Sequence, residues 1–246
     1  MDPTWAPYLL GGAAALLVGF SKTGLPGAAI PAVAMMAAAF PDQAKVSVGA
    51  ILPLLLAGDL FAISFYRRHA DWRRLGQLAP FVVAGMVPAY VVLRFVDDTV
   101  MRVLIGIIIL VLLAVHASRP WWGAGRLPDR TWFVALTGIL AGFATTVSNA
   151  AGPVMAIYLI SKRFDKLQFL GTAAWFFFFV NLSKVPGYAL LKMMTAATLR
   201  LNLLLVPAVV VGAILGVRAA RWVPQRLFDA LVIVLAGAAA VRMIVA

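Results

Sequence analysis

The sequence predicts an all-α polytopic membrane protein built from two inverted repeats, each a broken re-entrant helix pair followed by three transmembrane helices. Three observations predict this class. The 246 residues are 63% hydrophobic and only 12% charged, and apolar runs of roughly 20 residues, the length that crosses a bilayer, recur along the chain. Two apolar segments are interrupted by short polar stretches rich in glycine, proline and hydroxyl groups. The second half of the chain repeats the pattern of the first.

The composition excludes several other classes. The formal charge of +12 comes from basic residues in short loops between apolar segments, which indicates cytoplasmic anchoring rather than nucleic-acid binding. The absence of cysteine excludes disulfides, thiol chemistry and cysteine-based metal sites. The first residues lack a basic region, so we do not expect a cleaved signal peptide. Without a Walker loop, metal-ligand spacing or nucleophile elbow, we expect neither an enzyme nor a cofactor.

The first interruption is GFSKTGLPG at residues 19–27, between apolar residues 6–20 and 27–40. Each apolar piece is too short to span comfortably, and together they are too long for one helix, so we expect two half-helices that meet near the midplane. Because lipid cannot hydrogen-bond a broken backbone, such a break is buried in protein or lines a cavity. The simpler alternative is a kinked helix whose lysine extends to the interface.

The rest of the chain divides around a linker. Residues 118–130, SRPWWGAGRLPDR, join the halves, with Trp121 and Trp122 as expected interface anchors. The first repeat therefore covers residues 1–117, and the second covers residues 131–246. In the second repeat, apolar residues 131–147 are interrupted by TTVSNAAGP at residues 145–153 and continue over residues 154–160. Full spans are expected near residues 46–66, 75–95, 100–116, 167–190, 201–220 and 226–245.

The repeat is visible in residue matches at a nearly constant offset. GFSKTGLPG, which begins at Gly19, matches GFATTVSNAAG, which begins at Gly142, at an offset of 123. A small residue precedes each of these glycines by four positions, a spacing that lets helices approach closely. Residues 79–85, APFVVAG, resemble residues 206–212, VPAVVVG, at an offset of 127. Matches in the same order favour two homologous halves over chance.

The distribution of charge predicts the topology. If each break is a re-entrant pair, loops 67–74, 118–130, 161–168 and 218–226 share one side and hold thirteen lysines and arginines, against six on the other side. If each broken segment crossed the membrane once, the split would be ten against nine. The positive-inside rule favours the first arrangement. It places the N-terminus outside and inverts one half relative to the other, an architecture that holds substrate between the repeats.

The two breaks predict an anion site. A helix that begins inside the membrane directs free N–H groups and a partial positive charge at what lies before it. We expect such N-termini near residues 27 and 150, with Pro26 and Pro153 early in the helices and Asn149 or Ser148 as the second N-cap. The alternative is that the polar side chains only cap the breaks. The expected substrate-binding residues are Ser21, Lys22, Thr23, Gly24, Gly27, Thr145, Thr146, Ser148, Asn149 and Gly152.

Three polar residues inside the later spans are candidates for coupling. Asp59 lies within one span, Asn181 occupies the corresponding place at an offset of 122, and Lys184 follows one turn later. Buried ionisable groups can carry a coupled proton. The alternative is a static ion pair of Asp59 with Lys184 or with Lys22, and the sequence leaves both open. We expect the two histidines, His69 and His116, at the interface rather than as ligands.

The two broken segments resemble the sulfite exporter TauE/SafE family of membrane permeases. The resemblance rests on GFSKTGLPGAAIP at residues 19–31, on residues 142–153, and on the spacing of Lys45, Gly49 and Pro53. It covers essentially the whole chain. It implies transport of small sulfur-containing or organic anions, such as sulfite and sulfonates.

The resulting hypothesis is a secondary transporter of the cell (inner) membrane that binds a small anion at the midplane and is coupled to protons. The expected partners are the anionic substrate, the lipid bilayer and, as one option, a second copy of the chain; nucleic acid is not expected. An anion channel with the same site and a membrane scaffold without transport are the alternatives. A scaffold has no need of a charged, broken midplane.

Overall fold

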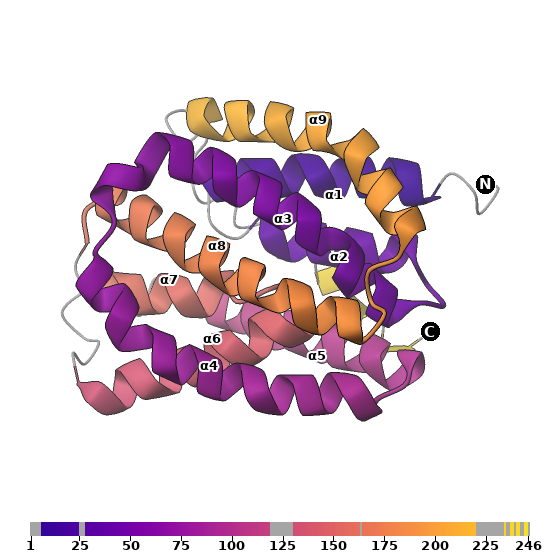
Figure 1. Ribbon diagram of the computed structural model, residues 1–246, viewed down its shortest axis with the longest axis horizontal. Coiled ribbons are helices and arrows are strands. Elements are labelled where there is room, and N and C mark those ends of the chain that lie inside the picture. Colours follow the sequence, from indigo (N-terminus) through magenta and orange to yellow (C-terminus); the bar gives the residue numbers. More distant parts are fainter. Residues whose placement is uncertain are drawn as a thin grey trace.

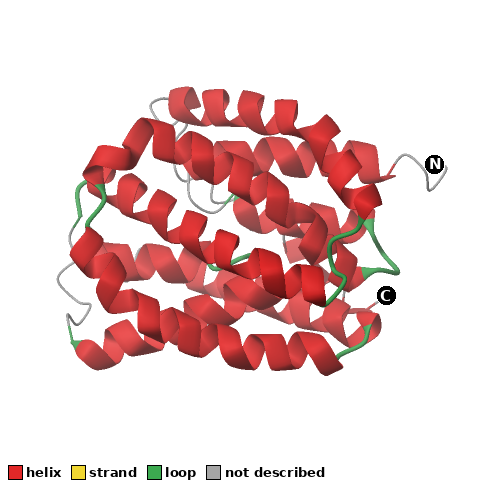
Figure 2. Ribbon diagram, viewed as in Figure 1, coloured by secondary structure: helices red, strands yellow, loops and turns green. Residues whose placement is uncertain are grey.

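The computed structural model describes residues 6–24, 28–118, 130–162 and 164–219, together with residues 234, 237, 238, 240, 241, 244 and 245. Helices joined by short turns account for this part of the chain, which contains no strand (Figure 2). Gly27, Pro26, the tryptophan pair of the linker and most of the last expected span lie outside the described residues. Six described helices are long and apolar enough to cross a membrane, which confirms the polytopic all-helical class. They are α3 (Ala44–Tyr66, followed by the 3-10 turn η1, Arg67–His69), α4 (Trp72–Phe95), α5 (Asp98–Ala117), α6 (Thr131–Ser148), α8 (Lys166–Leu190) and α9 (Ala196–Ala219).

Two pairs of helices flank the two breaks. α1 (Ala6–Thr23) is followed after the first break by α2 (Ala29–Ala39), and α6 is followed after the second break by α7 (Gly152–Ser161). Pro153 is the second residue of α7, where proline is tolerated because that N–H has no partner in the helix anyway.

The breaks are shorter than the sequence predicted. The polar residues expected to interrupt the helices instead form the last turns of α1 and α6. Hydroxyl groups in the last turn of α6 are satisfied within the helix, because they bond carbonyls one turn back. Thr146 Oγ1 donates to the Gly142 carbonyl at 2.8 Å, and Ser148 Oγ donates to the Ala144 carbonyl at 2.9 Å.

The two halves make matching helix contacts. α1 packs along α9, and α6 packs along α4 (Figure 1). A Cβ on Gly19 would overlap the carbonyl of Val209, and a Cβ on Gly142 would overlap the carbonyl of Val82. Gly142 follows Gly19 by 123 residues and Val209 follows Val82 by 127. These are the offsets of the sequence repeat, so each broken helix docks on the equivalent span of the other half.

Both broken segments return toward the end of the bundle from which they start. The loop after α3 lies beside the first turns of α8, where the Asp71 amide donates to Thr172 Oγ1 at 3.0 Å. α6 begins beside Arg74 near the start of α4, and the Tyr158 hydroxyl of α7 donates to the Arg74 carbonyl at 3.3 Å. At the other end of α3, the Lys45 amide donates to Asp98 Oδ1 at 2.8 Å. This arrangement supports the re-entrant prediction.

The membrane orientation stays a prediction that cysteine labelling can test. We expect single cysteines in Ala70→Cys and Phe164→Cys to react with a membrane-impermeant maleimide from the same, cytoplasmic side, because both loops belong to the basic set. The native chain has no cysteine to interfere. As the control, Asp42→Cys, in an exposed turn at the other end of α3, should react from outside. Labelling of positions 70 and 164 from opposite sides would refute the inverted repeat.

Candidate functional site

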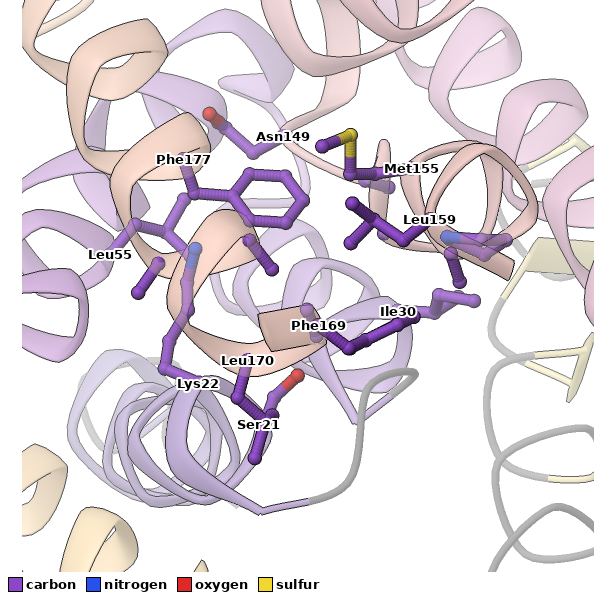
Figure 3. A pocket seen from close by; sticks show the side chains of 17 residues that line it. Ser21, Lys22, Ile30, Leu55, Asn149, Met155, Leu159, Phe169, Leu170 and Phe177 are labelled. Atoms are coloured by element: carbon purple, nitrogen blue, oxygen red, sulfur yellow. The ribbon is translucent and has the colours of Figure 1, made fainter. Parts of the chain in front are cut away.

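A buried cavity of about 50 Å³ lies where the two breaks meet. Since about 10–15 Å³ holds one water molecule, the cavity fits a ligand of a few heavy atoms. Its wall joins both halves of the chain, as Figure 3 shows from close by. The lining residues are Ser21, Lys22, Ala29, Ile30, Leu55, Asn149, Ala150, Gly152, Pro153, Met155, Ala156, Leu159, Phe169, Leu170, Ala173, Ala174 and Phe177.

The first turns of α2 and α7 contribute to this wall, and the described residues directly before them, at positions 28, 150 and 151, provide no side-chain cap. The N-cap of α2 is Ala28, which makes no capping hydrogen bond. The two residues before α7 are Ala150 and Ala151, whose side chains cannot accept one. Uncapped helix N-termini present free N–H groups and a partial positive charge, which is the arrangement that binds anions.

The expectation that Asn149 or Ser148 caps the second half-helix is wrong. Asn149 is the C-cap of α6 and adopts the left-handed conformation, with φ 56°. Its amide nitrogen donates to the Val48 carbonyl at 2.9 Å. The Ser148 hydroxyl turns back into α6. Both side chains therefore make their hydrogen bonds elsewhere and do not cap α7. The N-terminus of α7 stays open toward the cavity.

Gly152 adds space to the site. A Cβ built on this residue would meet no atom within 4 Å. A cavity this close to a helix start lets a ligand approach the backbone without a side chain in between.

Lys22 carries a positive charge to the cavity, but a carboxylate compensates that charge. Its Nζ lies 2.7 Å from Asp59 Oδ1 and 4.1 Å from the centroid of the Phe177 ring. Asp59 is fully buried in α3, and Asn181 of α8 donates to its other oxygen at 2.6 Å. Of the two ion pairs that the sequence left open, the structure contains the one with Lys22. The repeat-related pair of Asp59 and Asn181 therefore forms a direct hydrogen bond between the halves.

Lys184 is the second buried lysine, and its partners are neutral. Its Nζ donates to the carbonyl and hydroxyl oxygens of Thr145, at 3.0 and 3.1 Å, and to Asn149 Oδ1 at 2.5 Å. Among the described residues, no carboxylate oxygen lies within 4.0 Å of Lys184 Nζ, so this lysine has no ion-pair partner there. Asn149 therefore links the Lys184 ammonium to the cavity wall.

The other expected site residues lie around the cavity rather than in its wall. The Thr23 hydroxyl bonds the Ala213 carbonyl of α9 at 2.7 Å, and the Thr146 hydroxyl bonds the Gly142 carbonyl at 2.8 Å. Gly24 packs against the backbone of Gly216. These contacts hold the break-forming helices in place.

Two tyrosines were missed from the sequence. The Tyr66 hydroxyl donates to the Thr23 carbonyl at 2.9 Å, and the Tyr188 hydroxyl donates to the Thr146 carbonyl at 2.6 Å. Each satisfies a carbonyl at the end of a broken helix, a group that the helix itself leaves without a partner. Tyr188 follows Tyr66 by 122 residues, the offset that relates Asp59 to Asn181, and this offset was the available signal.

The histidines do not contribute to the cavity wall. His69 is exposed in η1, whereas His116 is buried in the last turn of α5. Both lie at the end of a membrane-spanning element, and their expected place at the membrane interface stays a prediction.

Broken helices that meet at a cavity inside a polytopic bundle define a membrane transport protein. Residues 9–243 match the sequence model of the sulfite exporter TauE/SafE family, and the chain belongs to this family. It is thus a multi-pass membrane protein of a family of sulfite-type anion transporters, and the family resemblance seen in the sequence is confirmed. Comparisons with curated proteins and with solved structures gave no match.

Proposed function

We propose that this protein is a secondary transporter of the cell (inner) membrane that moves a small anion, such as sulfite or a sulfonate, through the cavity between its two breaks. The observation that carries the proposal is the pair of uncapped N-termini, α2 and α7, at one cavity. Ser21, Lys22, Asn149 and Gly152 contact the anion in this proposal. Thr23, Gly24, Thr145, Thr146 and Ser148 support them.

Proton coupling through Asp59 is part of the proposal. While Asp59 is ionised, it holds the Lys22 ammonium. A proton on Asp59 would cancel this attraction and leave Lys22 free to contact an anion in the cavity that it already lines. Asn181 keeps the carboxyl group in place in both states through the hydrogen bond to Oδ2.

Filling the cavity at Gly152 tests the site. We expect Gly152→Leu to reduce sulfite transport by proteoliposomes to the background of protein-free vesicles, because the new side chain occupies space that is now empty. Gly76→Leu is the matched control, since a Cβ there also meets nothing within 4 Å but lies on α4, outside the cavity. Both variants should elute as folded protein.

The same vesicles separate the alternatives. A secondary transporter exchanges labelled for unlabelled sulfite and shows counterflow, whereas a channel conducts without counterflow. A scaffold gives no flux in the wild type. Transport by Gly152→Leu at the wild-type rate would move the substrate site away from this cavity.

A further inference from the structure

The charges buried beside the cavity do not balance. Three ionisable side chains gather there: Lys22 and Asp59, which form an ion pair, and Lys184, whose side chain is wholly buried and bonded only to neutral oxygens. We call these three residues the charge cluster. Three acceptor oxygens surround Lys184 Nζ, which matches the three donors of an ammonium. With Lys22 and Asp59 also ionised, the cluster carries a net charge of +1. A buried charge without a counter-ion is costly in a medium of low dielectric constant.

The excess charge lies close to the proposed substrate site. Lys184 Nζ bonds Asn149, and Asn149 and Lys22 both line the cavity. Figure 3 shows Lys22 extending from α1 toward Phe177, with Asn149 on the side of the second break. An anion in the cavity would supply the missing negative charge. Lys184 can therefore attract an anion electrostatically while Asn149 stands between them.

The groups that face Asp59 come from two helices. α1 contributes Lys22, and α8 contributes Asn181 and, one turn later, Lys184. Among the described residues of the other elements packed against α3, namely α2, α5, α9 and η1, no charged group reaches ion-pair distance from Asp59. The protonation of Asp59 is therefore the one change in this cluster that raises its charge from +1 to +2.

We infer that the cavity takes up one net negative charge in each binding event: a monoanion while Asp59 is ionised, or a dianion together with one proton on Asp59. The inference rests on the proposed function and specifies the charge of its substrate. In the dianion case, a proton moves from solvent to the Asp59 carboxylate. The ion pair between Lys22 and Asp59 is then lost, and Lys22 forms an ion pair with the bound anion. Lys184 acts as a positioning residue that sets the electrostatic balance.

Proton counting tests the inference directly. Sulfite is titrated into purified protein above neutral pH, where it is mainly a dianion, in two buffers with different ionisation enthalpies. We expect the wild type to take up about one proton per sulfite bound, whereas Asp59→Asn, with a cluster charge of +2, takes up none. Methanesulfonate, a permanent monoanion, should bind the wild type without proton uptake. Binding of sulfite dianion by the wild type without proton uptake would overturn the inference.

Charge restoration provides an independent test. Lys184→Gln keeps a hydrogen-bond donor but lowers the cluster charge to zero, so sulfite affinity should fall by roughly tenfold or more, the effect of a unit charge at close range. Adding Asp59→Asn returns the cluster to +1 and should recover most of the affinity. A double variant that binds as weakly as Lys184→Gln would contradict the inference. If Lys184→Gln does not fold, proton counting on the other two proteins decides.

Failure of the proposed function gives a different result. Wild-type protein that does not bind sulfite, or that binds it as well as Gly152→Leu does, would contradict the site itself. Normal binding that is blocked by Gly152→Leu but lacks the expected proton uptake would contradict only the charge balance.

Discussion

Lys22→Ala is expected to destabilise the folded protein by about 3–5 kcal/mol, because it leaves the Asp59 carboxylate buried without its counter-ion. Asp59 is fully buried and lies 2.7 Å from Lys22. The remaining hydrogen bond from Asn181 comes from a neutral amide, which compensates a charge only in part. The free energy of unfolding in detergent micelles, followed by helix content, measures the loss.

Two further variants assign the cause. Lys22→Met combined with Asp59→Asn removes both charges and should recover most of the stability, since replacing a buried ion pair by neutral groups is often close to neutral. Lys45→Ala, which removes a half-buried lysine at the start of α3, should change stability by less than about 1 kcal/mol. If Lys22→Ala unfolds like the wild type, the pair does not hold the two helices together.

The helices and their repeat could be predicted because hydropathy and length decide membrane spans. The expected span at residues 46–66 corresponds to α3, and that at residues 167–190 corresponds to α8. The ends of α1 and α6 could not be predicted in the same way. Polar residues such as serine and threonine favour helix ends in water, but inside the bundle the Thr146 and Ser148 hydroxyls bond carbonyls of their own helix.

The sequence predicted where a cavity would lie but not which side chains would meet there. The two breaks predicted a common cavity, and Lys22 and Asn149 line one. Which lysine pairs with Asp59 depends on side-chain reach across helices, and the sequence spacing allowed both. The role of Asn149 as a left-handed C-cap depends on where α6 ends, because asparagine occurs both as an N-cap and in the left-handed conformation that ends a helix.

The two tyrosines that contact the broken helices could have been predicted from the repeat. Tyr66 and Tyr188 match at the same offset as Asp59 and Asn181. A phenol near the end of a span is common at membrane interfaces and gives no signal alone. The recurrence of a tyrosine at that offset is a signal, because equivalent positions in the two halves face equivalent neighbours.

The second large loss of stability is expected where each broken helix closely approaches a helix of the opposite half. We expect Gly19→Val and Gly142→Val each to destabilise the fold by about 3 kcal/mol or more, the upper range for overpacked sites. In both cases a Cβ would overlap a backbone carbonyl, of Val209 or of Val82. A backbone cannot rotate away as a side chain can, so the helix pair must separate along its length.

The control lies on the same helix as Gly19. At Gly12 the nearest atom to a new Cβ is the end of the Leu205 side chain, at 4.0 Å. Gly12→Val should therefore change the free energy of unfolding by less than about 1 kcal/mol. The yield of monodisperse protein and its thermal unfolding midpoint in detergent give the comparison. A tolerated Gly142→Val beside a disruptive Gly19→Val would mean that α6 and α4 can separate while α1 and α9 cannot. Equal losses would mean that each half depends on the other through the same contact, since the two glycines face repeat-related carbonyls.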